Sequence, residues 1–195
     1  MRRKTIITTV EWCIAILLVF LYFKEGHTMN GSLTAAKAHQ LSERSYHYGP
    51  SQIVREVPYG KDTVIFLGLY KDWFSADTSV KQRMGWYPGG GVSGVAIDKS
   101  KPLTYFWEIS QLNKTLRLGK FFGYVSDPKI TTVVLNMVYL NDKREELNKT
   151  IELRESIKED RMFLFLWNEL ENQYRWKSIQ GMDDEGKVLY EYSFE

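Results

Sequence analysis

The sequence contains very little cysteine, histidine or net charge, and each shortage excludes a class of protein. The single cysteine, Cys13, lies in an apolar stretch, so the remainder of the chain cannot be a disulfide scaffold. The three histidines have no metal-ligand spacing and no further cysteine to assist them. A net charge of +2 over 195 residues lacks the basic excess that nucleic-acid binding requires. We therefore expect no metal, no cofactor and no nucleic-acid partner.

One long hydrophobic run is present, at the N-terminus. Residues 2–4 are all basic and precede the nineteen-residue run Thr5–Phe23. As a helix this run is about 28 Å long, close to the roughly 30 Å hydrocarbon core of a bilayer. Glu11 opposes insertion but lies nearer the basic end. The positive-inside rule predicts a single transmembrane anchor within residues 1–25, with the N-terminus in the cytoplasm.

The same run also allows an interpretation as a cleavable export signal. Trp12–Phe23 alone has the length of the apolar part of a signal peptide. Cleavage needs small residues just beyond it, whereas residues 24–27 read KEGH. This poor cleavage site favours an uncleaved anchor, with secretion after cleavage as the alternative.

The charge balance changes once the anchor is set aside. Residues 1–23 hold three of the 26 basic and one of the 24 acidic residues, so the remainder carries 23 of each. A neutral, cysteine-free exported domain is less typical of eukaryotic secretion, where disulfides are common. We expect residues 24–195 to lie outside a bacterial, particularly Gram-positive, cell membrane.

A short helix is expected after a polar stalk at residues 26–32. Ser32 is a suitable N-cap for a helix from Leu33 to about Tyr46, and Gly49-Pro50 would end it. The apolar stripe of this helix is thin. We therefore expect it to lie on the surface of a sheet.

After Pro50 the hydrophobic pattern changes to the period of strands. Strands are expected at Thr63–Tyr70, Val92–Asp98, Leu103–Ile109, Phe121–Ser126, Ile130–Leu140, Lys149–Ile157, Met162–Trp167, Tyr174–Gln180 and Val188–Phe194. Ile130–Leu140 is apolar on both faces, which is typical of a central strand. Lys149–Ile157 is ambiguous, because Asp142 and Glu145 form a possible capping box for a helix.

The predicted fold class is α+β and mainly β. It comprises an N-terminal transmembrane helix, one short helix and an antiparallel meander of about eight to ten strands. Residues 33–195 would form one extracytoplasmic domain, long enough to bury a core without disulfides.

Three glycines, Gly89, Gly91 and Gly94, satisfy the pattern G-x-G-x-x-G. A dinucleotide site needs a strand before this pattern and a helix after it, because helix N-terminal amides hold the pyrophosphate. Here residues 95–98 favour a strand. We predict a mobile surface turn and not a phosphate site.

No catalytic group is predicted. Ser93 lies in the glycine loop but does not match G-x-S-x-G, and His27, His39 and His47 all precede the strands. A serine hydrolase triad would require one of these histidines to fold back onto the loop. The acidic residues 183–185 are of the type that hydrolyses glycosides, but their sequence is typical of a solvated turn.

Aromatic residues are the best remaining indication of function. Trp73-Phe74 and Trp86-Tyr87 lie beside turn-like sequence, so they are candidate contacts for a sugar, a peptide or a protein partner. Core packing is the alternative for all of them. Glu11 is a possible contact within the membrane.

Two strings resemble uncharacterised membrane-anchored or secreted proteins of Bacillus-like Gram-positive bacteria. They are residues 122–130 (FGYVSDPKI) and residues 181–190 (GMDDEGKVLY). The resemblance extends over residues 33–194 in layout and about twenty residues in motif. It implies a location at the cell surface and no particular activity.

Three functions therefore stand as hypotheses. The first is a non-enzymatic binding domain held at the outer face of a membrane. The second is an exported hydrolase of cell-wall material that uses carboxylates not identifiable from sequence. The third is an accessory subunit of a membrane complex that contacts its partner through Glu11.

Overall fold

A computed structural model describes the backbone of residues 2–26, 31–141 and 143–194 and, within the first helix, the side chains of residues 7–19. Helix α1 comprises Arg2–Gly26 and helix α2 comprises Ala35–Ser45. No helix among the described residues is long and apolar enough to cross a membrane. Residues 27–30 of the predicted stalk and Asp142 of the possible capping box lie outside the described residues.

Twelve strands follow the helices in the described part of the chain. They are β1 (Gln52–Tyr59), β2 (Thr63–Tyr70), β3 (Trp73–Gln82), β4 (Gly85–Pro88), β5 (Val95–Ala96), β6 (Leu103–Gln111), β7 (Arg117–Val125), β8 (Thr132–Leu140), β9 (Glu146–Ser156), β10 (Met162–Asn168), β11 (Tyr174–Met182) and β12 (Val188–Ser193). All pairings among them are antiparallel. The mainly β prediction is confirmed.

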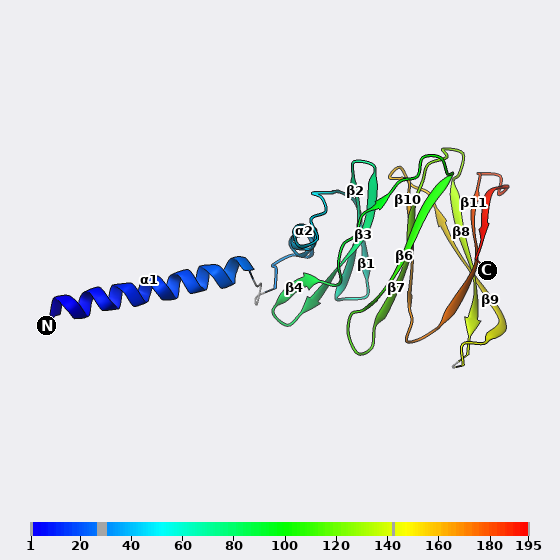
Figure 1. Ribbon diagram of the computed structural model, residues 1–195. Coiled ribbons are helices and arrows are strands. Elements are labelled where there is room, and N and C mark those ends of the chain that lie inside the picture. The colour runs from blue at the N-terminus through cyan, green and yellow to red at the C-terminus, as the bar shows by residue number, and fades with distance from the viewer. Residues whose placement is uncertain (1, 27–30, 142, 195) are drawn as a thin grey trace.

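The strands form three sheets that stack in layers (Figure 1). Sheet A has the order β1-β2-β3-β4, with β5 also paired to β3. Sheet B has the order β10-β7-β6, and sheet C the order β12-β11-β8-β9. Only the four strands β1 to β4 of sheet A follow chain order, so the predicted simple meander is wrong for the other two sheets.

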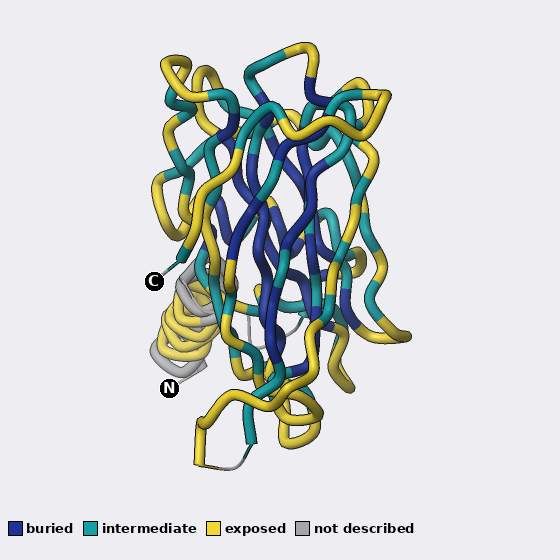
Figure 2. Tube along the Cα trace, turned by 90° about the vertical axis from the view of Figure 1, so that its right-hand side faces the viewer, coloured by how far each residue is buried: buried dark blue, intermediate teal, exposed yellow. Residues whose placement is uncertain are grey.

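Sheet B is the middle layer, and its central strand β7 is buried on both faces. Leu118 and Phe122 belong to the core shared with sheet A, whereas Phe121 and Val125 belong to the core shared with sheet C. This follows from the two-residue period of a strand. Figure 2 shows the buried residues along the middle of the strands and the exposed residues mostly in the turns at their ends.

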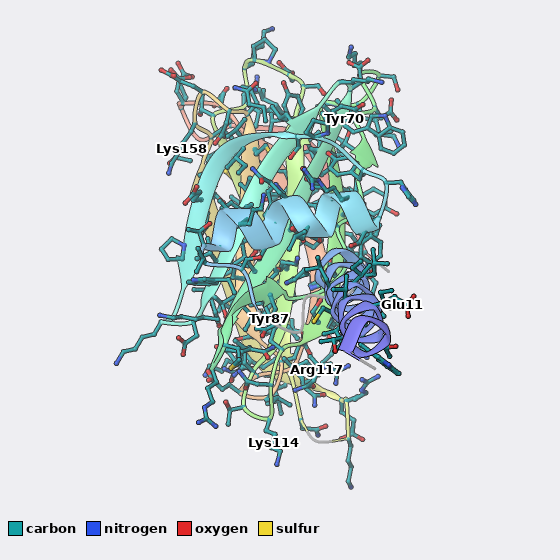
Figure 3. The ribbon with its side chains drawn as sticks, turned by 90° about the vertical axis from the view of Figure 1, so that its left-hand side faces the viewer. Glu11, Tyr70, Tyr87, Lys114, Arg117 and Lys158 are labelled. Atoms are coloured by element: carbon teal, nitrogen blue, oxygen red, sulfur yellow. The ribbon has the colours of Figure 1, made fainter. Side chains whose placement is uncertain are left out.

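Helix α2 crosses the outer face of sheet A (Figure 3), as the thin apolar stripe predicts. Its N-cap is Thr34, whose hydroxyl accepts a hydrogen bond from the Lys37 N–H at 3.2 Å. The predicted cap, Ser32, is instead paired with Trp86 of β4 through two backbone hydrogen bonds. The helix therefore begins two residues later than predicted.

Several strand predictions need correction. β2 has the predicted bounds, and residues 146–156 form strand β9, which resolves the ambiguity in favour of a strand. The strand predicted at Val92–Asp98 is reduced to the two residues of β5. Strands β1, β3 and β4 were not predicted. In β3 the reason is that Asp77 and neighbouring polar side chains face α2 and are buried by it.

Candidate functional site

An open aromatic cleft lies between the edge of sheet B and the edge of sheet C. Strands β6 and β12 each have a neighbour on one side only, and the space between them is not closed by a further strand of either sheet. A cavity of about 340 Å³ opens there. Its lining residues are Lys101, Leu103, Thr104, Tyr105, Tyr190 and Tyr192.

The strand registers bring three tyrosines into this cleft. Tyr105 of β6 pairs with Gly123 and lies against the core between sheets B and C. Tyr190 and Tyr192 of β12 are two residues apart and therefore share a face. Tyr192 pairs with Ile179 of that same core. Before Tyr190 the strand register shifts, so that Leu189 packs against the core and Val188 is exposed.

Aromatic rings form the floor and one end of the cleft. The ring of Tyr105 stacks on buried Phe121 at a centroid distance of 5.3 Å and lies 6.0 Å from Tyr192. Farther along β6, Trp107 meets the edge of Trp176 at 4.9 Å and remains 47% exposed. The exposure of Trp107 follows from the edge position of β6.

Burial raises the pKa of two of the phenols in the cleft. Burial, with smaller contributions from Tyr192 and Tyr190, raises the pKa of Tyr105 to about 12. Burial likewise raises the pKa of Tyr190. Within the described residues, no protein group is hydrogen-bonded to the hydroxyls of these three tyrosines. Each hydroxyl can therefore both donate to and accept from a bound molecule.

The cleft carries one cation and no carboxylate among its lining residues. The ammonium group of Lys101 lies 3.3 Å from Asp98 Oδ2, and both side chains are well exposed, so this ion pair holds the lysine only weakly. Glycoside hydrolysis normally uses two facing carboxyl groups. The arrangement suits recognition of a ring-shaped polar molecule, by stacking and hydrogen bonding, better than catalysis.

The four aromatic residues predicted as contacts do not form one surface. Trp73 is 44% exposed, but Phe74 is fully buried and packs against Phe122, so its prediction as a contact is wrong. Trp86 and Tyr87 are half-buried on β4. Trp73 begins β3, whereas β4 pairs with the other end of that strand. None of the four lines the β6–β12 cleft.

Glu11, the predicted contact within the membrane, is exposed on α1 (Figure 3). The part of the chain that the structure describes provides no partner for it within the domain.

The glycine loop is held more firmly than predicted. Val92 is 2% exposed, which fixes the middle of the loop to the domain. A Cβ atom on Gly91 would lie 2.5 Å from the ring of Tyr46, and one on Gly94 would lie 2.2 Å from the ring of Tyr48. The loop continues into β5 and not into a helix, so the arrangement of a dinucleotide site is absent here.

His39 occupies a position that the sequence did not predict. From α2 its Nδ1 lies 2.7 Å from Asp77 Oδ2 of β3, and Asp77 also accepts a hydrogen bond from Ser42. The other ring nitrogen, Nε2, lies 3.4 Å from Glu43 Oε1. Because Nε2 faces a carboxylate and the imidazole is 1% exposed, this group is no serine hydrolase triad. It attaches α2 to sheet A.

The acidic turn at residues 183–185 has a structural role. Asp183 accepts hydrogen bonds from the N–H groups of Glu185 and Lys187, so it shapes the turn before β12 as predicted. Among the residues that the structure describes, no group of His, Cys, Asp and Glu side chains is placed to hold a metal ion.

Comparison with known proteins identifies neither a family nor a related structure. No family model matches this chain, and no curated protein or solved structure is significantly similar to it. The function is therefore inferred from the residues and geometry of the cleft.

The sequence signal for the cleft was only partial. In the sequence, the alternation of Tyr190, Tyr192 and Phe194 indicates an aromatic face on the last strand. Nothing local in the sequence shows that Tyr105, some 85 residues earlier in the chain, belongs to a different sheet that packs opposite that face.

Proposed function

We propose that this protein is a membrane-anchored binding domain on the outer face of a bacterial membrane, with the β6–β12 cleft as its ligand site. The observation that carries the binding proposal is the convergence of three phenols, none hydrogen-bonded to a described residue, on a cavity whose lining residues include no carboxylate. Binding is preferred to hydrolysis for that reason.

Support for the anchor comes from the sequence and from α1. The run Thr5–Phe23 has the length and flanking charges of a single span. All described side chains of α1, residues 7–19, are exposed, and they include Trp12, Ile16 and Leu18 at 60% or more. These exposed apolar side chains are available to contact lipid, although Thr8, Thr9 and Glu11 interrupt the apolar surface of the helix.

The ligand class that fits the cleft is a saccharide of the cell wall. Tyrosine rings provide flat apolar faces, and their hydroxyls provide donors and acceptors. A sugar ring presents the matching combination of C–H faces and hydroxyl groups. Lys101 adds a cation for an acidic substituent.

A titration of the full chain in detergent micelles with soluble peptidoglycan fragments tests this function. Saturable changes in tryptophan fluorescence are expected, because Trp107 lies beside the cleft. Tyr192→Ala should weaken binding several-fold, since one aromatic contact contributes about 1 kcal/mol. Tyr59→Phe, a change on β1 in sheet A, is the matched control. Absence of binding, or equal binding by the Tyr192 variant, would contradict the proposal.

A further inference from the structure

Two large apolar side chains are exposed where the chain enters the domain. Ser32 and Trp86 exchange two backbone hydrogen bonds of 2.7 and 2.8 Å, which ties the entering segment to β4. Next to this bridge, Leu33 is 96% exposed and Met84 is 61% exposed. Neither belongs to a described core cluster.

Four exposed positive charges lie on the two elements that carry or adjoin these residues, helix α2 and the β3–β4 hairpin. On α2 the exposed charged side chains are Lys37 and Arg44, because Glu43 is buried. On the β3–β4 hairpin they are Lys81 and Arg83. Within the described residues none of these four cations forms an ion pair. We call these four cations with Leu33 and Met84 the entry face.

Elsewhere on the domain the exposed cations are of two kinds. Some are paired, in the ion pairs Lys99–Asp72, Lys101–Asp98, Arg154–Glu152, Arg175–Glu146 and Lys177–Glu146. Others, such as Lys114, Lys158 and Lys187, form no ion pair with a described residue. The β1–β2 turn beside the entry face carries one charge of each sign, Lys61 and Asp62. Since residues 24–195 are neutral overall, the unpaired positive charge of the entry face is a local concentration.

Covalent reach keeps this face near the end of the proposed anchor. α1 ends at Gly26 and the described chain resumes at Gly31, a separation of at most about 18 Å for a fully extended chain. The headgroup layer on each side of a bilayer is about 5–7 Å thick. The start of the domain at Gly31, next to Ser32 and Leu33, is thus held close to the end of α1 whatever path residues 27–30 take.

We propose that the entry face docks on the anionic headgroups of the membrane that holds α1. The four cations contact lipid phosphates, and Leu33 and Met84 enter the interfacial region, as in amphipathic membrane-binding surfaces. This inference rests on the proposed anchor. Docking would orient the domain, because α2 and sheet A would then lie next to the bilayer and sheet C farthest from it.

The test uses the full chain with a single environment-sensitive fluorophore. Cys13→Ser removes the native thiol, and Met84→Cys supplies the labelling site. Glu185→Cys, in the exposed turn before β12, is the matched control on the distant sheet. Each protein is reconstituted into vesicles of phosphatidylcholine alone or with phosphatidylglycerol, both containing a lipid whose headgroup carries a spin-label quencher.

We expect strong quenching at position 84 and none at position 185 in vesicles with phosphatidylglycerol. Quenching at position 84 should be lost in phosphatidylcholine alone, and also when Lys37, Arg44, Lys81 and Arg83 are all replaced by Gln. Equal quenching at both positions, or quenching indifferent to the anionic lipid, would overturn the docking proposal. A chain that fails to float with vesicles after alkaline washing contradicts the anchor instead.

Discussion

The ammonium nitrogen of Lys120 lies 3.2 Å from Oε1 of Glu108, in the interface between sheets B and A. Lys120 is 1% exposed. It also donates to the carbonyl oxygen of Ala76 at 2.6 Å and to the hydroxyl of Thr78 at 2.8 Å. One side chain of β7 thus connects the middle sheet to β3, and every N–H of the ammonium has an acceptor.

Replacing this lysine should destabilise the domain strongly. Lys120→Ala leaves a carboxylate and two further acceptors without their donor and opens a cavity, so the free energy of unfolding should fall by about 3–5 kcal/mol. Lys120→Met retains most of the side-chain volume, so it should lower the free energy of unfolding by less. Chemical denaturation measures both. Lys99→Ala, which breaks an exposed ion pair, is the control, and an equal effect from it would refute the role of Lys120.

Tyr105 should make stability depend on pH in the alkaline range. Its pKa is raised from 10.0 to about 12 in the folded domain, so its stabilising contribution is complete below pH 10 and is lost as the pH rises through about 12. The difference in unfolding free energy between the wild-type chain and Tyr105→Phe should therefore decrease over this interval. An alkaline absorbance titration should also show one fewer late-ionising phenol in the variant. An unchanged titration would contradict the burial of this hydroxyl.

Two neighbouring glycines should respond differently to alanine. A Cβ on Gly90 meets its nearest atom at 3.4 Å, whereas one on Gly91 meets the Tyr46 ring at 2.5 Å. Neither glycine has a positive φ. Gly90→Ala should be close to neutral, and Gly91→Ala should cost about 1 kcal/mol because the half-exposed ring must move.

Combining Gly91→Ala with Tyr46→Ala should remove most of that cost, as a double-mutant cycle would show. The same variants test for a nucleotide site. Neither ATP nor NAD should raise the melting temperature of the wild-type chain. A saturable rise in melting temperature that Gly91→Ala abolishes would contradict the interpretation of this loop as a purely structural turn.

The sequence predicted the strands that are rich in apolar side chains. β2 was predicted with its observed bounds, and the aromatic face of β12 was predicted as well. β3 was missed because its outward residues are polar. Asp77 bonds to His39, and Ser79 donates to the carbonyl oxygen of Ala35. A polar strand face that is buried by polar groups of a helix has no hydrophobic period to detect.

The candidate site was also difficult to predict from the sequence. The residues predicted as contacts were pairs of neighbouring aromatic residues, but successive residues of a strand point to opposite faces. In Trp73-Phe74 one ring is therefore exposed while the other is core. The cleft depends instead on how sheet B packs on sheet C, which brings Tyr105 to Tyr192 across 87 residues of sequence.

The location of the domain relative to the membrane is the central claim, and protease treatment of intact protoplasts tests it most directly. The full chain, with a C-terminal epitope tag, is expressed in a Gram-positive host. We predict that the epitope is in the membrane fraction and is lost when protease is added outside, while a cytoplasmic marker survives. An epitope that resists protease until the protoplasts are lysed, or a soluble mature form released into the medium, would contradict a membrane-anchored domain on the outer face.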